Sequence, residues 1–293
     1  MPNLKEVRNR IVSVSSTQQI TSAMKMVSAA KLKRAQDAII KMRPYASKLR
    51  EVLENLSAGL DASDSAYSKQ TEAKNVLLVV ITSNRGLAGA FNANIIKKAN
   101  QTIKYQYKNA QVDVLCIGKK GFDFYKKTDR KFFADDYTGS NNSLFDKLNY
   151  NSVAPLAEAV MQAFLSGKYD KVDIVYNQFK NAAVQHASTE PFLPVSPNTT
   201  SSSKTKKMEY IFEPNKEEII KDLIPLSLKT QFYKALLDSS ASEHGARMTA
   251  MHKATDNAKD LIKQLKLTYN KARQANITKE ILEIVGGAEA LNG

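Results

Sequence analysis

The sequence has a single cysteine, three histidines and no long apolar run. The lone cysteine, Cys116, excludes an internal disulfide and is typical of a protein from a reducing compartment. It lies in the largely apolar run 112–117, which indicates a buried, unreactive thiol. No stretch of about 18 apolar residues is present, so we expect no membrane span. Residues 1–14 also lack the apolar core of a signal peptide.

The scarce histidines form no pattern typical of a metal or catalytic site. His244 and His252 are eight residues apart on one expected helix, too far to chelate one ion, and no cysteine or carboxylate stands at ligand spacing. No Ser/His/Asp or Cys/His arrangement can be assembled from the spacing. We therefore expect no catalytic residues, no metal and no cofactor.

Acidic residues are also in deficit. The chain has 43 Lys and Arg against 29 Asp and Glu, a formal net charge of +14. Residues 1–50 hold eleven of the basic residues and only two acids, Glu6 and Asp37, a local excess of 11 − 2 = +9. Such a surface favours an acidic protein, a membrane face or nucleic acid as partner.

Both ends of the chain show the 3-4 spacing of a left-handed coiled coil. The first stretch spans residues 4–56, at about 1.5 Å per residue some 80 Å of helix. The first set of seam positions is Leu4, Val7, Ile11, Val14, Gln18, Thr21, Lys25, Ser28, Leu32, Ala35, Ile39, Met42, Ala46, Leu49, Leu53 and Leu56. The second set is Met248, Met251, Thr255, Ala258, Ile262, Leu265, Tyr269 and Ala272.

These two stretches enter and leave the same middle region, so their natural pairing is antiparallel, with a parallel homodimer as the rival arrangement. The second helix should extend beyond the first, which leaves its C-terminal end exposed or inserted in a partner. We expect Pro44 to kink the first helix or mark a joint in it, and Pro225 to interrupt the second. The first helix should be capped near Gly59 and the second should stop at Gly286 and Gly287.

The middle region changes to an α/β pattern. Continuous Val/Leu/Ile runs predict buried strands at 76–81, 112–118 and 171–176. Helices are expected at 91–107 and 153–165, and this alternation is typical of a largely parallel sheet. We expect edge strands within residues 182–195, a last short strand at 208–212, and loops at 61–70 and 198–207. The predicted fold class is α/β: a long antiparallel coiled coil of the terminal helices (1–60 and 213–293) plus a central Rossmann-like α/β domain (70–212).

One turn of the middle region has the position of a phosphate loop. Residues 82–91 follow the first strand and precede a helix. The glycines, however, are spaced G-x-x-G, without a Gly-Lys-Ser/Thr or a third glycine. A tight structural turn is the preferred interpretation, and a nucleotide-binding enzyme that uses the Gly86 turn is kept as an alternative.

The coiled-coil seam turns polar at Gln18, Thr21, Lys25 and Ser28, while small residues are dense around them. A polar seam lowers coiled-coil stability, so four such positions in a row call for another reason. A smooth surface beside Lys25 and Lys31 suits sliding or rotating contact with an acidic partner. A basic coiled-coil protein that binds nucleic acid remains the alternative, although this segment lacks the aromatic residues on which bases stack.

At five segments the chain resembles the gamma subunits of bacterial F-type ATP synthases. The resemblance is most specific at residues 277–290, ITKEILEIVGGAEA, and covers the whole chain. Further matches lie at 17–36, 84–92, 246–257 (ARMTAMHKATDN) and 269–275 (YNKARQA).

This resemblance implies a non-catalytic central-stalk rotor. The coiled coil would turn inside a hexamer of α and β subunits, and the α/β domain would rest on the membrane c-ring with the ε subunit. Proton or sodium flow through the ring would thereby drive ATP synthesis at the β subunits, on the cytoplasmic face of the bacterial plasma membrane. The partners implied include no nucleic acid.

The resemblance also assigns contact residues. Met24 and Lys25 would face an acidic segment of β, and Arg273 and Gln274 would meet a β loop with Thr278 and Glu280 close by. Tyr210 would belong to the foot that touches ε or the c-ring. Glu280 and Glu283 stand three apart on one helix face, which we interpret as a partner contact and not as an acid pair for catalysis.

Overall fold

A computed structural model of the chain describes residues 3–57, 66–69, 71–133, 142–145, 148–195 and 216–292. It divides into two compact units. One unit combines Met1–Ser28 with Met248–Gly293, and the other comprises Ala29–Arg247. We call them the helical hairpin and the α/β unit.

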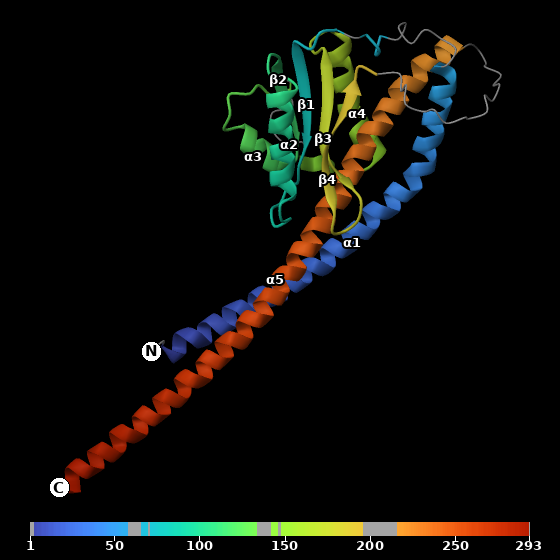
Figure 1. Cartoon of the computed structure of the whole chain (residues 1–293). Coiled ribbons are helices and arrows are strands. Elements are labelled where there is room, and N and C mark those ends of the chain that lie inside the picture. The colour runs from blue at the N-terminus through green and yellow to red at the C-terminus, as the bar shows by residue number, and fades with distance from the viewer. Residues whose placement is uncertain are drawn as a thin grey trace. The chain divides into compact units, whose positions relative to one another are not determined.

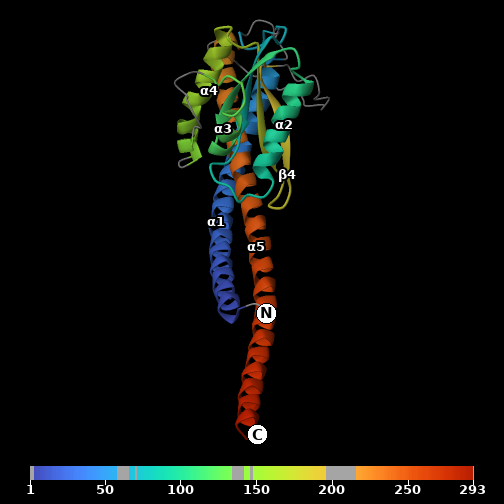
Figure 2. The same cartoon turned by 90° about the vertical axis from the view of Figure 1, so that its left-hand side faces the viewer.

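Two long helices, α1 (Leu4–Ser57) and α5 (Lys216–Asn292), supply the whole hairpin. With 77 residues, α5 is about 115 Å long at ~1.5 Å per residue. Within the hairpin the start of α1 lies beside the later part of α5, with the chains running in opposite directions (Figures 1 and 2). This confirms the antiparallel pairing expected from the 3-4 spacing.

The α/β unit is built on one four-stranded sheet. Its strands are β1 (Asn75–Ile81), β2 (Gln111–Ile117), β3 (Lys171–Phe179) and β4 (Gln185–Leu193), in the order β2-β1-β3-β4. The first three are parallel and β4 pairs antiparallel with β3. The expected strands and edge strand are therefore confirmed. The residues of β1 from Val76 on are buried on both faces, as their unbroken apolar run requires.

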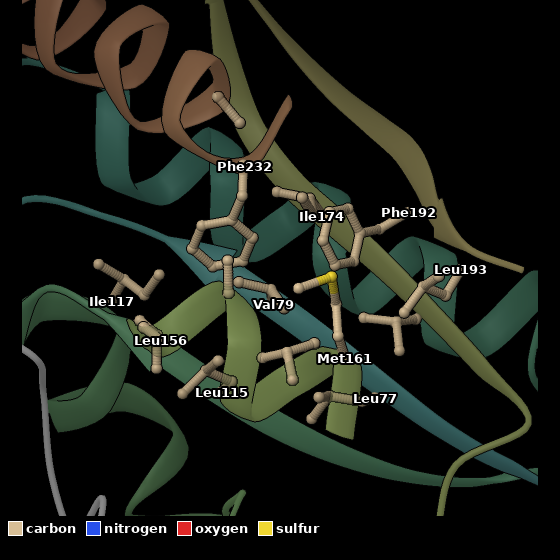
Figure 3. Packing of buried hydrophobic residues seen from close by; sticks show 14 of the residues in the cluster. Leu77, Val79, Leu115, Ile117, Leu156, Met161, Ile174, Phe192, Leu193 and Phe232 are labelled. Carbon is tan, nitrogen blue, oxygen red and sulfur yellow. The ribbon is translucent and has the colours of Figure 1, made fainter. Parts of the chain in front are cut away.

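Helices cover both faces of this sheet. On one face, α2 (Phe91–Tyr105) and α3 (Lys119–Tyr125) pack against alternate residues of β1 and β2. On the other, α4 (Tyr150–Leu165) and the first half of α5 enclose a core into which Phe232 and Met161 project (Figure 3). A 3-10 turn, Asn142–Phe145, adds Leu144 and Phe145 to this second core.

Because α5 contributes Leu228, Phe232, Ala235 and Leu236 to this core, the helix is part of the α/β unit as well as of the hairpin. In the same unit the second half of α1 buries Leu32, Ala35, Ile39 and Leu49, all seam positions of the sequence. The seam pattern thus continues into the α/β unit.

Two expectations about α5, where it ends and whether it is interrupted, are wrong. The expected stop at Gly286 and Gly287 does not occur, since α5 continues to Asn292. A glycine ends a helix when it takes a left-handed conformation, and neither of these two has a positive φ. Pro225 does not interrupt α5 either, although it removes one helical donor. Its neighbour Leu228 is buried in the core, which holds the helix in place on the C-terminal side of the proline.

Pro44 lies inside α1, and the ribbon of α1 bends in its second half, which contains this proline, in agreement with the expected kink (Figure 1). The short α3 and the 3-10 turn were not expected from the sequence. The cap at Gly59, most of the loop 61–70, the loop 198–207 and the short strand 208–212 lie outside the described residues.

Candidate functional site

The buried seam of the hairpin follows the predicted positions. Val7, Thr21 and Ser28 of α1 are buried, as are Met251, Thr255, Ala258 and Ala272 of α5. Gln18 and Lys25 are half-buried, so the polar seam faces the partner helix as the spacing predicts.

A threonine pair explains how this seam tolerates polar groups. The hydroxyls of Thr21 and Thr255 lie 2.8 Å apart in a buried hydrogen bond. Both hydroxyls also lie within hydrogen-bond distance of their own helix backbone: Thr21 Oγ1 is 3.0 Å from the Gln18 carbonyl oxygen, and Thr255 Oγ1 is 2.8 Å from that of Met251. Ser28 donates to the Met24 carbonyl oxygen at 2.8 Å. Buried polar groups satisfied in this way cost little and fix the register of the two helices.

A double-mutant cycle tests this register bond. We expect Thr21→Val and Thr255→Val each to lower the free energy of unfolding by about 1 kcal/mol, because a buried hydrogen bond is lost while the side-chain shape is kept. The double variant should lose less free energy of unfolding than the two single variants lose together. Urea unfolding followed by helical circular dichroism measures the three values. Strict additivity would show that the two hydroxyls do not interact.

The outward face of α1 in the hairpin is apolar to an unusual degree. Ile20, Met26 and Val27 are between 56% and 65% exposed, and Ala23 and Ala30 continue the stripe that Ile20 and Val27 begin. Large exposed apolar residues in one patch indicate a protein contact. Met24 and Lys25 are half-buried at its edge, so their side chains are partly available to a partner.

A second exposed region is the C-terminal end of α5. Every residue from 276 to 290 is exposed, which confirms that α5 extends beyond its helical partner. Five large apolar side chains in this segment are about half or more exposed: Ile277 47%, Ile281 54%, Leu282 66%, Ile284 71% and Val285 51%. Exposure of these apolar side chains to water is unfavourable, which indicates that this segment inserts into a partner.

The candidate contact residues fall into two separate groups. Arg273, Gln274, Thr278 and Glu280 lie on exposed turns of α5, where Thr278 donates to the Gln274 carbonyl oxygen at 2.9 Å. Met24 and Lys25 lie near the level of Thr255, which is 18 residues before Arg273 or about 27 Å along the helix. The structure therefore places these residues in two bands. Tyr210 lies outside the described residues.

In the α/β unit, the turn 82–90 is a structural element closed by α5. Leu87 and Gly89 adopt positive φ angles of 61° and 59°, and Asn92 Oδ1 accepts from the Ser83 backbone N–H at 3.0 Å. Arg247 of α5 donates to the carbonyl oxygens of Arg85 and Gly86 at 3.0 and 3.3 Å. Parallel sheets bind ligands at the carboxyl ends of their strands, and here α5 takes up that position. This supports the structural interpretation of the turn over a phosphate loop.

The clamp on this turn rests on a buried ion pair. Arg247 Nη1 is 2.7 Å from Glu243 Oε1, and both side chains are about nine-tenths buried. Burial raises the pKa of Glu243, while Arg247 lowers it in opposition. His244 beside them has a pKa lowered to about 4, first by burial and then by the positive charges of Arg247 and Lys31, so it is neutral at pH 7.

The same helix carries a second buried acid, Asp238. Burial raises its pKa to about 6, and the charges of Lys234 and of Arg43 on α1 act in the opposite direction. Sequence reasoning missed both acids because spacing alone does not show burial. The signal that could have found the first was the i, i+4 pair Glu243–Arg247 in a stretch of small residues.

Other chemistry is limited within the described part of the chain. It holds no group of three or more His, Cys, Asp or Glu placed to bind a metal ion. Cys116 is buried, as expected, and burial raises its pKa to about 12, so the side chain stays a protonated, unreactive thiol at neutral pH. None of the described helices has a stretch apolar enough to cross a membrane.

Comparison with known proteins identifies the family of the chain from matches along its whole length. Residues 3–291 match the sequence profile of the family described as ATP synthase. The ATP synthase gamma chain of Flavobacterium johnsoniae is 62% identical over 294 residues, and that of Cytophaga hutchinsonii 58% over 299, each match covering 100% of both chains. The gamma chain of Chlorobaculum tepidum is 46% identical over 296 residues, covering 99% of each chain. The chain belongs to the ATP synthase family and, within it, to the gamma chains.

Experimental structures agree with this assignment. A chain of the Tetrahymena thermophila mitochondrial ATP synthase, from its central stalk and c-ring, aligns with a TM-score of 0.57 at 26% identity, covering 80% of this chain and 99% of that one. A chain of the Euglena gracilis mitochondrial ATP synthase rotor aligns with a TM-score of 0.63, covering 94% and 98%. At 21% identity the second shows the fold alone. None of these relatives supports the nucleic-acid alternative.

Proposed function

We propose that this gamma subunit of the ATP synthase central stalk couples ion flow to nucleotide chemistry by rotation. Its hairpin turns inside the hexamer of α and β subunits, and proton or sodium flow through the c-ring drives that turning. ATP synthesis or hydrolysis then takes place at the catalytic sites of β. The full-length match to gamma chains at up to 62% identity is the observation that carries this proposal.

In this proposal the chain itself has no catalytic role. The turn 82–90, at the position of a phosphate loop, is closed by Arg247, and the outward face of α1 in the hairpin offers apolar contact surface. A shaft needs stiffness and asymmetry. It also needs unequal affinity for the conformations of its partners, because a partner bound equally in all states shifts no equilibrium.

The two exposed bands of the hairpin are the proposed β contacts. Met24 and Lys25 form the first, where a positive charge at an apolar edge suits an acidic segment. Arg273 and Gln274 form the second, with Thr278 and Glu280 on the following turns. The exposed apolar end of α5 lies within the hexamer, which would remove its side chains from water.

The remaining assignments concern the foot of the subunit. We propose that the α/β domain, residues 70–212, contacts the ε subunit and the c-ring, with Tyr210 at that contact. The terminal segments 1–60 and 213–293, which contain α1 and α5, then act as the shaft. The subunit is held at the cytoplasmic face of the bacterial plasma membrane through the complex.

The upper contact gives the test of this function. We expect Arg273→Ala plus Gln274→Ala to weaken binding of the chain to the α/β hexamer about 5- to 30-fold, because one or two hydrogen bonds worth about 1–2 kcal/mol are lost. The ratio of ATP made to ions moved in reconstituted vesicles should fall as well. Hexamer binding and this ratio are measured on the same preparations.

A matched control is available on α2. Lys97 and Gln101 are exposed there, and Lys97→Ala plus Gln101→Ala removes the same kinds of group from the α/β unit. We expect this variant to bind the α/β hexamer as tightly as the unmodified chain does. Unchanged binding and coupling in the Arg273/Gln274 variant would remove these two residues from the list of β contacts.

A further inference from the structure

A basic cavity lies at the end of α2, on the side of the α/β unit away from α5. It has a volume of about 490 Å³ and is lined chiefly by Asn100, Lys104, Tyr105, Tyr107, Lys108 and Arg130. Tyr107 is buried at its base, whereas Lys104, Tyr105 and Lys108 are exposed around it. Ligand sites of small molecules are typically about 300–1,000 Å³, so the cavity is of suitable size.

The charge of the lining is one-sided. Three cations line the cavity and no carboxylate does. Lys104 lies in the last turn of α2 and Lys108 in the turn after the helix, and both line the cavity, so their like charges repel. The C-terminal end of α2 contributes at most about half a negative charge, which offsets only a small part of the three. Among the described residues, no ion pair engages Lys104, Lys108 or Arg130.

The neutral polar groups of the lining also leave donors toward the cavity. Asn100 Oδ1 accepts from the Tyr125 hydroxyl at 3.1 Å, so the amide nitrogen is the group that Asn100 can offer to a ligand. The Tyr107 hydroxyl donates to Asp173, a buried residue behind it, which holds the base of the cavity in place. A ligand that accepts several hydrogen bonds and carries negative charge would satisfy this lining.

We propose that this cavity binds a polyphosphate anion, with the di- or triphosphate of a nucleotide as the ligand class. Lys and Arg side chains form charge-assisted hydrogen bonds to phosphate oxygens, and three cations exceed what one phosphate group requires. Tyr105 is 74% exposed, with Lys104 Nζ 5.8 Å from its ring centroid, and the planar ring of such a ligand stacks on the ring face that Lys104 leaves open. This site is independent of the proposed rotation, and binding to the isolated full-length chain tests it alone.

The test uses pyrophosphate and ADP as probes in calorimetric titrations of the full-length chain. We expect both to bind, and the affinity to fall as salt is raised. In the variant Lys104→Gln, Lys108→Gln, Arg130→Gln, the dissociation constant of each probe should rise about tenfold or more, because charge-assisted contacts are lost. The control Lys253→Gln, Lys266→Gln, Lys271→Gln makes the same charge change at exposed positions of α5 and should bind as the unmodified chain does.

Two outcomes would overturn the proposal. The first is no detectable binding of pyrophosphate to the unmodified chain at low salt. The second is an equal loss of binding in both triple variants, which would show only a general effect of net charge. The ring contact has its own test, since Tyr105→Ala should weaken ADP and leave pyrophosphate unchanged. Unchanged ADP binding in that variant would contradict the stacking on Tyr105.

Discussion

Arg247→Ala is expected to destabilise the α/β unit by about 3–5 kcal/mol, because removal of one partner from a buried ion pair leaves the other charge uncompensated. Glu243 would lose the guanidinium 2.7 Å from its carboxylate. The carbonyl oxygens of Arg85 and Gly86 would lose their donors as well, so the turn 82–90 would be held less firmly. Urea unfolding of the full-length chain measures the loss, and hydrogen exchange at residues 83–90 locates it.

The pH dependence of this loss identifies its cause. Without Arg247, the pKa of Glu243 rises further above its ordinary value. A carboxyl whose folded pKa lies above its unfolded pKa stabilises the fold at low pH and loses that contribution as pH rises. The free energy of unfolding of Arg247→Ala should therefore lie further below that of the unmodified chain at pH 8 than at pH 5.

Two companion variants separate charge from packing. Arg247→Ala plus Glu243→Ala removes both charges and should recover part of the loss. Arg247→Lys keeps the charge without the planar donor arrangement. Its free energy of unfolding should lie between those of Arg247→Ala and the unmodified chain. A single Arg247→Ala variant as stable as the unmodified chain would contradict the role of this clamp.

Gly118→Ala should be the other severe change, with a loss of about 3–5 kcal/mol from steric overlap and backbone strain together. Gly118 joins β2 to α3 with a φ of 106°, a conformation in which side chains are rarely found. A Cβ at this position would lie 2.2 Å from the Thr82 carbonyl oxygen. That oxygen cannot move freely, because the Thr82 backbone N–H donates to the Ile117 carbonyl oxygen at 2.8 Å and so holds the residue at the end of β1.

Gly167→Ala provides the matched control. Gly167 also has a positive φ, 76°, but nothing lies within 4 Å of the Cβ that alanine would add. This control isolates the conformational cost, about 1–2 kcal/mol. Comparing the urea midpoints of the two variants measures the steric part. Equal losses would mean that β1 and β2 can separate at Thr82 without further cost.

Local sequence pattern was sufficient for much of this fold. The 3-4 spacing located both seams residue by residue, because burial in paired helices requires apolar or small side chains on one face. The Val/Leu/Ile runs located β1, β2 and β3 for the same reason in a sheet covered on both sides. The gamma-chain resemblance rested on segments such as residues 277–290, which the comparisons bear out over the whole length.

Helix ends were predicted less well, and the cause is physical. Pro225 and Gly286 each weaken a helix locally by a few kcal/mol or less, and packing elsewhere on the same helix can exceed that cost. Leu228 and Phe232, three and seven residues beyond Pro225, are buried in the sheet's core. Spacing along the chain does not reveal such anchors, since they depend on residues brought from β3 and α4.

The sequence by itself determined which surfaces are buried between helices, which strands are central, and the family to which the chain belongs. Only the tertiary structure decided that Thr21 meets Thr255, that Arg247 closes the turn at Gly86, and that Lys104, Lys108 and Arg130 share one cavity. The reason is the range of the interactions. Periodicity reports contacts made along one element, whereas hydrogen bonds and charge clusters between separate elements exist only once the chain has folded.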